Sequence, residues 1–173
     1  TFGGGGHSQY ILSKLSNEGF LYAFDQDEDA VKNAIPVPNF KLIGGNFKFI
    51  KNHLLALGVK KVDAILADIG VSSHQFDIAD RGFSFMRDGP LDMRMDTSRG
   101  LSAAEWIASA DEQEIARVIK EYGEERFARR MASAVIRERA IKPITGTVQL
   151  AKILAAAHPA WERGRHPATK AFQ

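Results

Sequence analysis

The sequence predicts an α/β domain built on a parallel sheet, followed by an all-helical segment. Short apolar runs alternate with stretches of helical periodicity up to about residue 98, which is the pattern of βαβ units. From residue 102 onwards the periodicity is helical and arginine becomes frequent. With 173 residues, the chain is long enough for one ordinary domain, or for one domain that carries a small inserted one.

Three strands are expected in the first half. Residues 20–24, 41–43 and 62–69 are short apolar runs bounded by turn-forming or acidic residues, so each is predicted to be a buried strand. Their nearly continuous apolar character favours a parallel sheet, because helices cover such a sheet on both faces.

Helices are expected around these strands. Apolar residues at helical spacing predict helices over residues 8–16, 28–34 and 46–57. Asp27 is the expected N-cap of the second helix, and Gly58 is the expected C-terminal cap of the third.

Residues 70–100 show little apolar periodicity and many Gly, Asp and Arg residues. A stretch of this length without regular structure is usually functional in a compact domain. Because it contains Phe76, Phe83 and Phe85 as well as three methionines, we expect an ordered loop.

The remaining sequence is expected to be helical. Residues 102–105 and 109–112 both match the Ser-x-x-Glu capping box, and the second of these predicts a helix that runs to about Tyr122. Further helices are predicted over residues 124–140 and 147–157. We therefore expect an α/β core at residues 1–100 that includes the loop 70–100, a helical subdomain at residues 101–165, and the start of a return to the core at residues 166–173.

The composition is that of a soluble globular protein, with 45% apolar and 25% charged residues. The chain has no cysteine, which excludes a disulfide framework, thiolate metal sites and a cysteine nucleophile. No apolar run reaches the roughly 18 residues of a membrane span. We expect a cytoplasmic protein without a membrane partner.

Positive charge is concentrated near the end of the chain. Residues 126–173 contain ten Lys or Arg and two Asp or Glu, whereas residues 1–98 contain ten and twelve. Such clustering is typical of proteins that bind a polyanion. On charge alone, a solvent-exposed helix face explains this clustering as well as a polyanion-binding surface does.

Four glycines, Gly3 to Gly6, stand before the first expected helix. A glycine turn between a strand and a helix lets a ligand approach the main chain. Asp25 ends the next expected strand. In nucleotide-binding βαβ units, an acid about 20 residues after the glycines accepts hydrogen bonds from the ribose hydroxyls, and Asp25 stands at about this position. The dinucleotide fingerprint fails at Ser8 and no P-loop motif occurs. S-adenosylmethionine remains the favoured nucleoside, although the glycines alone leave the choice open, and a flexible linker is the simplest alternative.

Residues 67–96, ADIGVSSHQFDIADRGFSFMRDGPLDMRMD, closely resemble the signature of the bacterial 16S ribosomal RNA cytosine-N4 methyltransferases, the MraW or RsmH family. TFGGGGHS, SAAEW, YGEERFARRMASAV and HPATKAFQ match the same family, so the resemblance covers essentially the whole chain. It implies a Rossmann-like methyltransferase sheet with an inserted all-helical subdomain. It also implies methyl transfer from S-adenosylmethionine to N4 of a cytosine in the decoding region. Members of the family extend further at both ends, so we expect this chain to be a fragment with an incomplete sheet.

The resemblance assigns the cofactor contacts. Carried over position by position, they fall on Gly5, Gly6, His7, Asp25, Phe47, Asp68 and Gln75. The simpler interpretations are a surface residue for His7, core packing for Phe47 and a loop-capping acid for Asp68. For Gln75, the chemistry of a loop amide allows many roles.

Cytosine N4 is a poor nucleophile, so an acceptor near the amino group is expected to assist and later take its proton. The Asn/Asp-Pro-Pro-Tyr motif of many amino-methyltransferases is absent, because Asp68 is followed by Ile-Gly-Val. Asp68, Asp88 and Asp92 are the catalytic candidates, and we leave them unranked. Asp92 and Arg94 are also able to form an ion pair that only shapes the loop. We expect no metal.

The target base has to leave its stack. Phe83, Phe85, Met86 and Pro90 are able to hold it, or to pack the loop on itself. We expect Arg126, Arg129, Arg130 and Arg137 to contact phosphates of 16S ribosomal RNA or of the small ribosomal subunit.

The sequence leaves the oligomeric state open, with a homodimer as one option. A non-catalytic RNA-binding or ribosome-assembly module is the alternative function, and a nicotinamide-dependent oxidoreductase is a weaker one.

Overall fold

A computed structural model describes residues 1–160, 164 and 166–173. The chain forms two compact units, Thr1–His74 and Gln75–Gln173, which we call the α/β unit and the helical unit. The division falls within the loop 70–100, between His74 and Gln75, so most of that loop belongs to the helical unit. The end of the expected helical subdomain, residue 165, lies outside the described residues.

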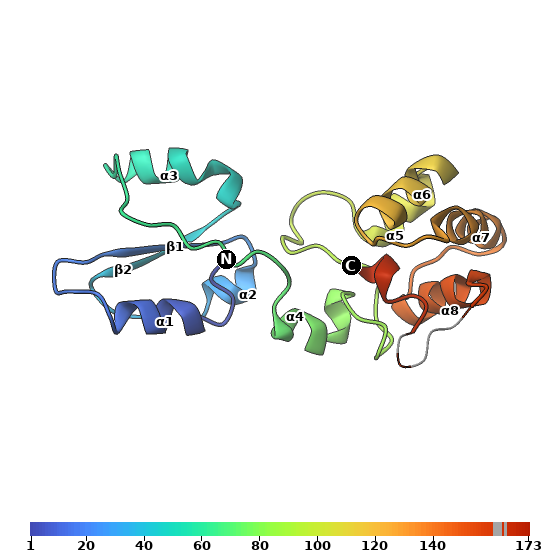
Figure 1. Ribbon diagram of the computed structural model, residues 1–173, viewed down its shortest axis with the longest axis horizontal. Helices are drawn as coiled ribbons and strands as arrows, with labels where there is room; N and C mark the ends of the chain where they lie inside the picture. Colours follow the sequence, from blue (N-terminus) through green and yellow to red (C-terminus); the bar gives the residue numbers. More distant parts are fainter. Residues whose placement is uncertain (161–163, 165) are drawn as a thin grey trace. The chain divides into compact units, whose positions relative to one another are not determined.

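The α/β unit is built on two parallel strands, β1 (Leu21–Asp25) and β2 (Phe40–Gly44), in which Leu21 pairs with Phe40 and Asp25 with Gly44. The helices α1 (Gly6–Leu12) and α2 (Glu28–Val31) lie on one side of the sheet and α3 (Ile50–Ala56) on the other (Figure 1). This layering confirms the α/β class and two of the three expected strands.

Side chains alternate across the two strands as the pleat requires. Phe40 packs with Phe2 and Ala30 in a small core on the α1 and α2 side. Phe24 of β1 points to the opposite side, where its ring lies 5.9 Å from that of His53 in α3.

The expected third strand is wrong: residues 62–69 form no strand and are exposed. A strand becomes stable by pairing along its length and by burying its faces. The Thr1 nitrogen and Oγ1 donate to the Asp68 carbonyl at 2.8 and 3.1 Å, at the end of the segment. Ile65 and Leu66 remain 72% and 63% exposed, so neither of these two side chains is buried.

Local capping explains several of the helix ends. Asp27 caps α2 by accepting from the Asp29 N–H, as expected. Gly58 has φ 78° directly after the third expected helix, which is split into the 3₁₀ turn η1 (Phe47–Phe49) and α3. Ser102 and Glu105 form the expected capping box of α5 (Ala103–Ser109).

The second expected capping box is wrong. Asp111 caps α6 (Glu112–Glu121) by accepting from the Glu114 N–H, because aspartate is as good an N-cap as serine and stands next to the helix. Ser109 instead donates to the carbonyls of Glu105 and Trp106.

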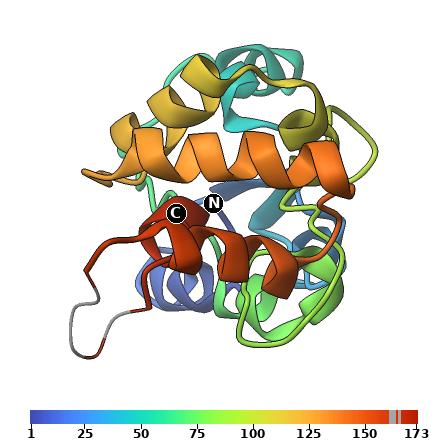
Figure 2. The same cartoon turned by 90° about the vertical axis from the view of Figure 1, so that its right-hand side faces the viewer.

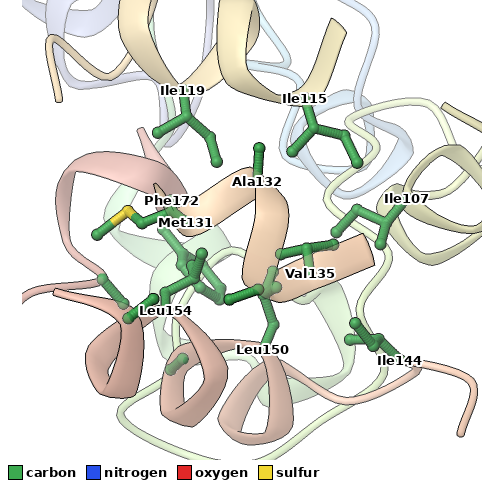
Figure 3. Packing of buried hydrophobic residues seen from close by; sticks show 14 of the residues in the cluster. Ile107, Ile115, Ile119, Met131, Ala132, Val135, Ile144, Leu150, Leu154 and Phe172 are labelled. Carbon is green, nitrogen blue, oxygen red and sulfur yellow. The ribbon is translucent and has the colours of Figure 1, made fainter. Parts of the chain in front are cut away.

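The helical unit packs around α7 (Ala128–Ile141), which lies between α6 and α8 (Thr147–Ala157) (Figure 2). Met131 and Val135 of α7 are almost fully buried and face Ile115 and Leu154 from the flanking helices (Figure 3). The short turn η3 (Lys170–Phe172) adds Phe172 to the same core.

The segment 70–100, most of which belongs to the helical unit, is not wholly irregular. It contains α4 (Ser73–Asp77), which spans the division between the units, and the 3₁₀ turn η2 (Ala79–Arg81). Leu91 is 1% exposed and its N–H donates to the Thr145 carbonyl at 2.8 Å. Within the described parts of the chain, the helices are all too short or too polar to cross a membrane.

Candidate functional site

The glycine turn has a conformation that requires glycine at two positions. Gly3 and Gly5 have φ values of 56° and 80°, and Gly5 is the N-cap of α1. A Cβ atom on Gly5 would lie 2.8 Å from the Phe2 ring, whereas Cβ atoms on Gly4 and Gly6 would meet open space. The turn therefore presents bare main chain outward while its inner side packs on Phe2.

Asp25 holds this turn at the carboxyl end of β1. Its Oδ2 accepts from the N–H groups of Phe2 and Gly3 at 3.1 and 2.9 Å, and its Oδ1 accepts from the Asp27 N–H at 3.0 Å. The side chain is 6% exposed. A carboxylate offers about four acceptor positions, so these bonds leave about one for a ligand hydroxyl.

The end of β2 lies beside the end of β1. The Gly45 N–H donates to the Asp25 carbonyl at 2.7 Å, and the Asn46 amide donates to Gln26 Oε1 at 3.0 Å. Phe47 follows in η1 with 43% of its surface exposed. This exposure argues against core packing as the reason for an aromatic residue at this position.

His7 and Asp68 form the third part of the constellation. His7 Nδ1 lies 3.3 Å from Asp68 Oδ2, and the two side chains are 70% and 64% exposed. Such an exposed pair contributes little to stability, and it is ionic only when the imidazole is protonated. The pair leaves a carboxylate accessible next to the glycine turn.

The structure thus brings most of the predicted cofactor residues into one unit. Gly5, Gly6, His7, Asp25, Phe47 and Asp68 belong to the α/β unit. Gln75 is 5% exposed on α4 and belongs to the helical unit.

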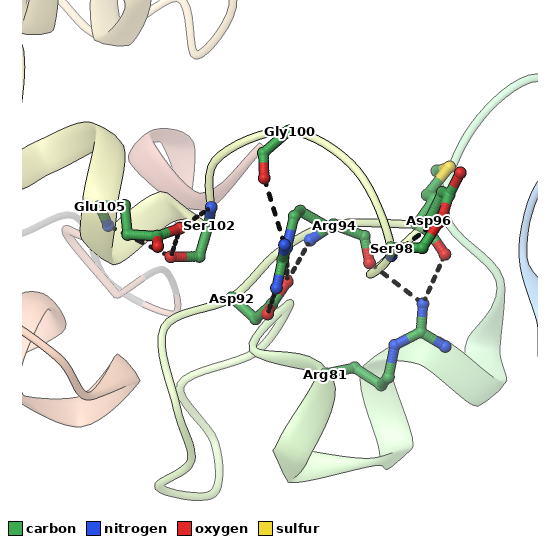
Figure 4. A network of polar contacts seen from close by, with 9 residues as sticks. Arg81, Asp92, Arg94, Asp96, Ser98, Gly100, Ser102 and Glu105 are labelled. Carbon is green, nitrogen blue, oxygen red and sulfur yellow. Dashed lines mark hydrogen bonds and ion pairs between the residues drawn. The ribbon is translucent and has the colours of Figure 1, made fainter.

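Two catalytic candidates have structural partners in the helical unit. Asp88 Oδ1 accepts from the Val148 N–H at 3.2 Å, which supplies α8 with the side-chain cap that Gly146 lacks. Asp92 binds Arg94 through Nη2–Oδ2 and Nε–Oδ1 contacts of 2.6 and 2.9 Å (Figure 4). The ion pair considered from the sequence therefore exists.

Charge and hydrogen bonds fix the loop around Asp92. The Arg94 guanidinium holds the pKa of the Asp92 carboxyl below its usual value, with burial of the carboxyl opposing the shift. Arg94 also donates to the Gly100 carbonyl, and Arg81 donates to the carbonyls of Arg94 and Met95 at 3.1 Å (Figure 4). The loop is consequently shaped by its own side chains.

The aromatic residues proposed to hold a base serve packing. Phe83 is buried, and the Phe85 ring lies 4.7 and 4.9 Å from those of His166 and Phe172. Met86 and Pro90, the other two residues considered for the base, are exposed, Met86 at 84%.

The arginines expected to contact RNA are exposed on or just before α7. Arg129, Arg130 and Arg137 lie on the helix, and Arg126 lies against the Phe127 ring at 4.5 Å. Arg139 differs, because its Nη1 donates to the carbonyls of Ile107 and Ala110 at the end of α5. The described residues contain no group of three or more side chains suited to a metal ion.

The anchoring roles of Asp88 and Arg139 were missed from the sequence. Both connect segments far apart in the chain, 60 residues for Asp88 and 29 to 32 for Arg139. Periodicity and local motifs report on neighbours within a few residues, so they carry no signal for such contacts.

Comparison with known proteins identifies the family. A profile of the MraW methylase family matches residues 1–173. The protein named "Ribosomal RNA small subunit methyltransferase H" from Alteromonas mediterranea is 54% identical over 177 residues, which cover 100% of this chain and 56% of that protein. The protein of the same name from Acinetobacter baumannii ATCC 17978 is 49% identical, with 57% of its length covered. The chain therefore spans little more than half the length of these relatives.

Proposed function

The chain belongs to the MraW methylase family, and on this premise we propose that it is part of an S-adenosylmethionine-dependent ribosomal RNA methyltransferase. The proposed target is N4 of a cytosine in the decoding region of 16S ribosomal RNA. The observation that carries the proposal is the glycine turn anchored on Asp25 at the carboxyl ends of two parallel strands. Ligands of open α/β sheets bind at this edge.

The residues at this edge fit a nucleoside with an amino-acid tail. Gly4 and Gly6 leave the main chain open to a close approach, and Gly5 keeps the turn in shape. The remaining acceptor position of Asp25 suits a ribose hydroxyl, and the exposed Phe47 ring suits an adenine face. When bound, S-adenosylmethionine supplies an already activated methyl group.

The protein's own contribution is then orientation and proton handling. Holding two reactants in line can lower such a barrier by about 7–11 kcal/mol. Asp68 is the acceptor we favour for the N4 proton, because its carboxylate is exposed and lies beside His7 and the glycine turn. Asp88 and Asp92 are less suited, since Asp88 caps α8 and Asp92 is held by Arg94 through two hydrogen bonds.

RNA binding is proposed for the helical unit. Arg126, Arg129, Arg130 and Arg137 present guanidinium groups to solvent, where they suit phosphate contacts. The names of the two relatives refer to ribosomal RNA of the small subunit, which supports this RNA as the substrate.

Calorimetry with S-adenosylmethionine tests the cofactor site. We expect the chain to bind the cofactor and Asp25→Ala to weaken binding by about tenfold or more, which corresponds to about 1.4 kcal/mol. Glu18→Ala, which removes an exposed acid from the turn before β1, serves as the matched control and should bind as the unaltered chain does. Absence of binding at millimolar cofactor would favour a non-catalytic RNA-binding or assembly module.

The target position requires a separate measurement. Mass mapping of small-subunit RNA from cells that lack the gene should reveal the loss of one methyl group on a cytosine of the decoding region. Loss of a methyl group elsewhere would contradict the proposed target but not the cofactor site.

A further inference from the structure

A hollow opens between α7 and α8 in the helical unit. It measures about 210 Å³ and is lined by Arg130, Arg137 and Glu138 of α7 and by Ile153 and Ala156 of α8. The two helices lie side by side (Figures 1 and 2). Pockets for drug-sized ligands measure about 300–1,000 Å³, so this hollow has room for one ligand smaller than most drugs, such as a single nucleobase with its phosphate at the arginines.

The two arginines at the hollow lie on one face of α7. Arg130 and Arg137 are seven residues apart, which is two helical turns or about 10.5 Å along the axis. Ala134 lies between them and also lines the hollow, and its short side chain leaves the space between the two guanidinium groups open.

Neither arginine has a structural task within the described part of the chain. Both are exposed, and no hydrogen bond or ion pair joins them to another described residue. Other arginines of the unit are engaged: Arg117 pairs with Glu114 and Glu121 at 2.8 Å, and Arg139 caps α5. Arg130 and Arg137 are therefore available to a ligand.

The lining favours an anion that also has an apolar, planar part. Two guanidinium groups outweigh the single carboxylate of Glu138, which disfavours cations and neutral molecules. The wall of Ile153 and Ala156 is apolar and suits the face of a nucleobase. Glu138 is an acceptor that base amino groups can use. A phosphate alone would leave both the wall and the carboxylate without a role.

We propose that this hollow binds one unpaired nucleotide of the substrate RNA, distinct from the methylated cytosine. Its phosphate contacts Arg130 and Arg137, its base lies on the wall of α8, and a base amino group donates to Glu138. The inference rests on the proposed function for the presence of RNA. A single unpaired base fits because sequence-specific RNA recognition acts mainly on unstacked bases.

Binding of short RNAs, followed by fluorescence anisotropy at two or more salt concentrations, tests the hollow. Arg130→Gln/Arg137→Gln should weaken binding of a single-stranded RNA of mixed sequence by about tenfold at about 50 mM salt. It should also reduce the slope of log K against log salt concentration by about 0.7–1.4 in magnitude. Lys120→Gln/Lys142→Gln removes the same charge outside the hollow and should change affinity by less than about threefold. Equal losses in the two double variants would overturn the proposal.

Two further variants test the base contact without changing the arginines. Ala156 is exposed, so the larger side chain of Ala156→Leu fills the hollow without disturbing the core. This variant should weaken single-strand binding by about fivefold or more, while its helix content stays unchanged. Glu138→Gln should remove the preference for oligocytidine, which has an amino group, over oligouridine, which has none. Unchanged binding by Ala156→Leu, or equal affinity of the unaltered chain for the two oligomers, would overturn the base contact.

Two controls separate the hollow from the cofactor site and from duplex binding. All variants should bind S-adenosylmethionine as the unaltered chain does. If the proposed function is wrong, the unaltered chain itself does not bind S-adenosylmethionine, and this result is distinct from a failure of the hollow to bind RNA. A duplex that binds as tightly as the single strand, and is weakened equally by the arginine changes, would contradict recognition of an unpaired nucleotide.

Discussion

The two units differ in the size of the apolar core that each of them buries. The α/β unit buries Phe2, Ala30 and Phe40 in a small cluster and leaves Ile65 and Leu66 largely exposed. The helical unit buries a continuous core of at least sixteen described residues around α7. Yet nearly all predicted cofactor residues lie in the unit with the smaller core. The comparison teaches that the glycine turn, for which cofactor binding is proposed, is held by hydrogen bonds around Asp25 rather than by extensive apolar packing.

Matched leucine substitutions give the largest expected contrast between the units. Leu154 is 1% exposed in the helical core, so Leu154→Ala is expected to lower the free energy of unfolding by about 2–5 kcal/mol. Leu66 is 63% exposed in the α/β unit, and Leu66→Ala is expected to change the free energy of unfolding by less than about 0.5 kcal/mol. Urea denaturation followed by circular dichroism measures both. Similar losses in the two variants would contradict the contrast.

The glycine turn gives the next largest effect. Gly5→Ala places a side chain at φ 80° and against the Phe2 ring, so a loss of about 1–3 kcal/mol in stability and loss of cofactor binding are expected. Gly58 has a similar φ of 78° with no atom near its Cβ position, which makes Gly58→Ala the matched control. We expect this control to retain full cofactor affinity by calorimetry. Equal affinity of the two variants would argue against a site at the turn.

The Asp92–Arg94 pair tests whether the helical unit depends on charge as well as on packing. Because Arg94 lowers the pKa of Asp92 in the folded state, the pair stabilises the fold above the ordinary pKa of about 3.9. That contribution is lost as the pH falls through the lowered pKa. Asp92→Asn is expected to lower stability by about 1–2 kcal/mol at pH 7.

The corresponding measurement is the unfolding free energy of both chains as a function of pH. The difference between them should shrink progressively as the pH falls below about 4. A difference that stays constant down to pH 2 would show that Asp92 acts through its shape and not through its charge.

The smallest effect is expected at the surface of α6. Arg117 contacts Glu114 and Glu121 at 2.8 Å, but these side chains are 40–53% exposed. Exposed ion pairs contribute little, because water screens them and the side chains lose freedom. Arg117→Gln should leave the denaturation midpoint unchanged within error at both low and high salt.

Local signals in the sequence predicted most of the fold. The alternation of apolar runs gave β1 and β2, and Asp27, Gly58 and Ser102 acted as the predicted caps, because each acts on residues within a few positions. The prediction of a third strand was wrong, because an apolar run becomes a strand only when it pairs with a neighbouring strand. Residues 62–69 lack that pairing.

The candidate site was predicted in part. The position of Asp25 at the end of β1 followed from spacing, whereas Gly5, the N-cap of α1, was assigned to the site by the family resemblance. The bonds from Asp25 to Phe2 and Gly3 join residues 22 and 23 positions apart, and no local pattern predicts them. The hollow between α7 and α8 depends on helix packing, which periodicity does not specify.

Nuclear magnetic resonance of the backbone amides during titration with S-adenosylmethionine tests the central claim most directly. If the turn anchored on Asp25 binds the cofactor, the amide signals of Gly4, Gly6 and His7 shift and saturate together, while those of Met131 and Val135 in the helical core stay in place. Saturable shifts that leave the glycine turn unaffected would contradict the account.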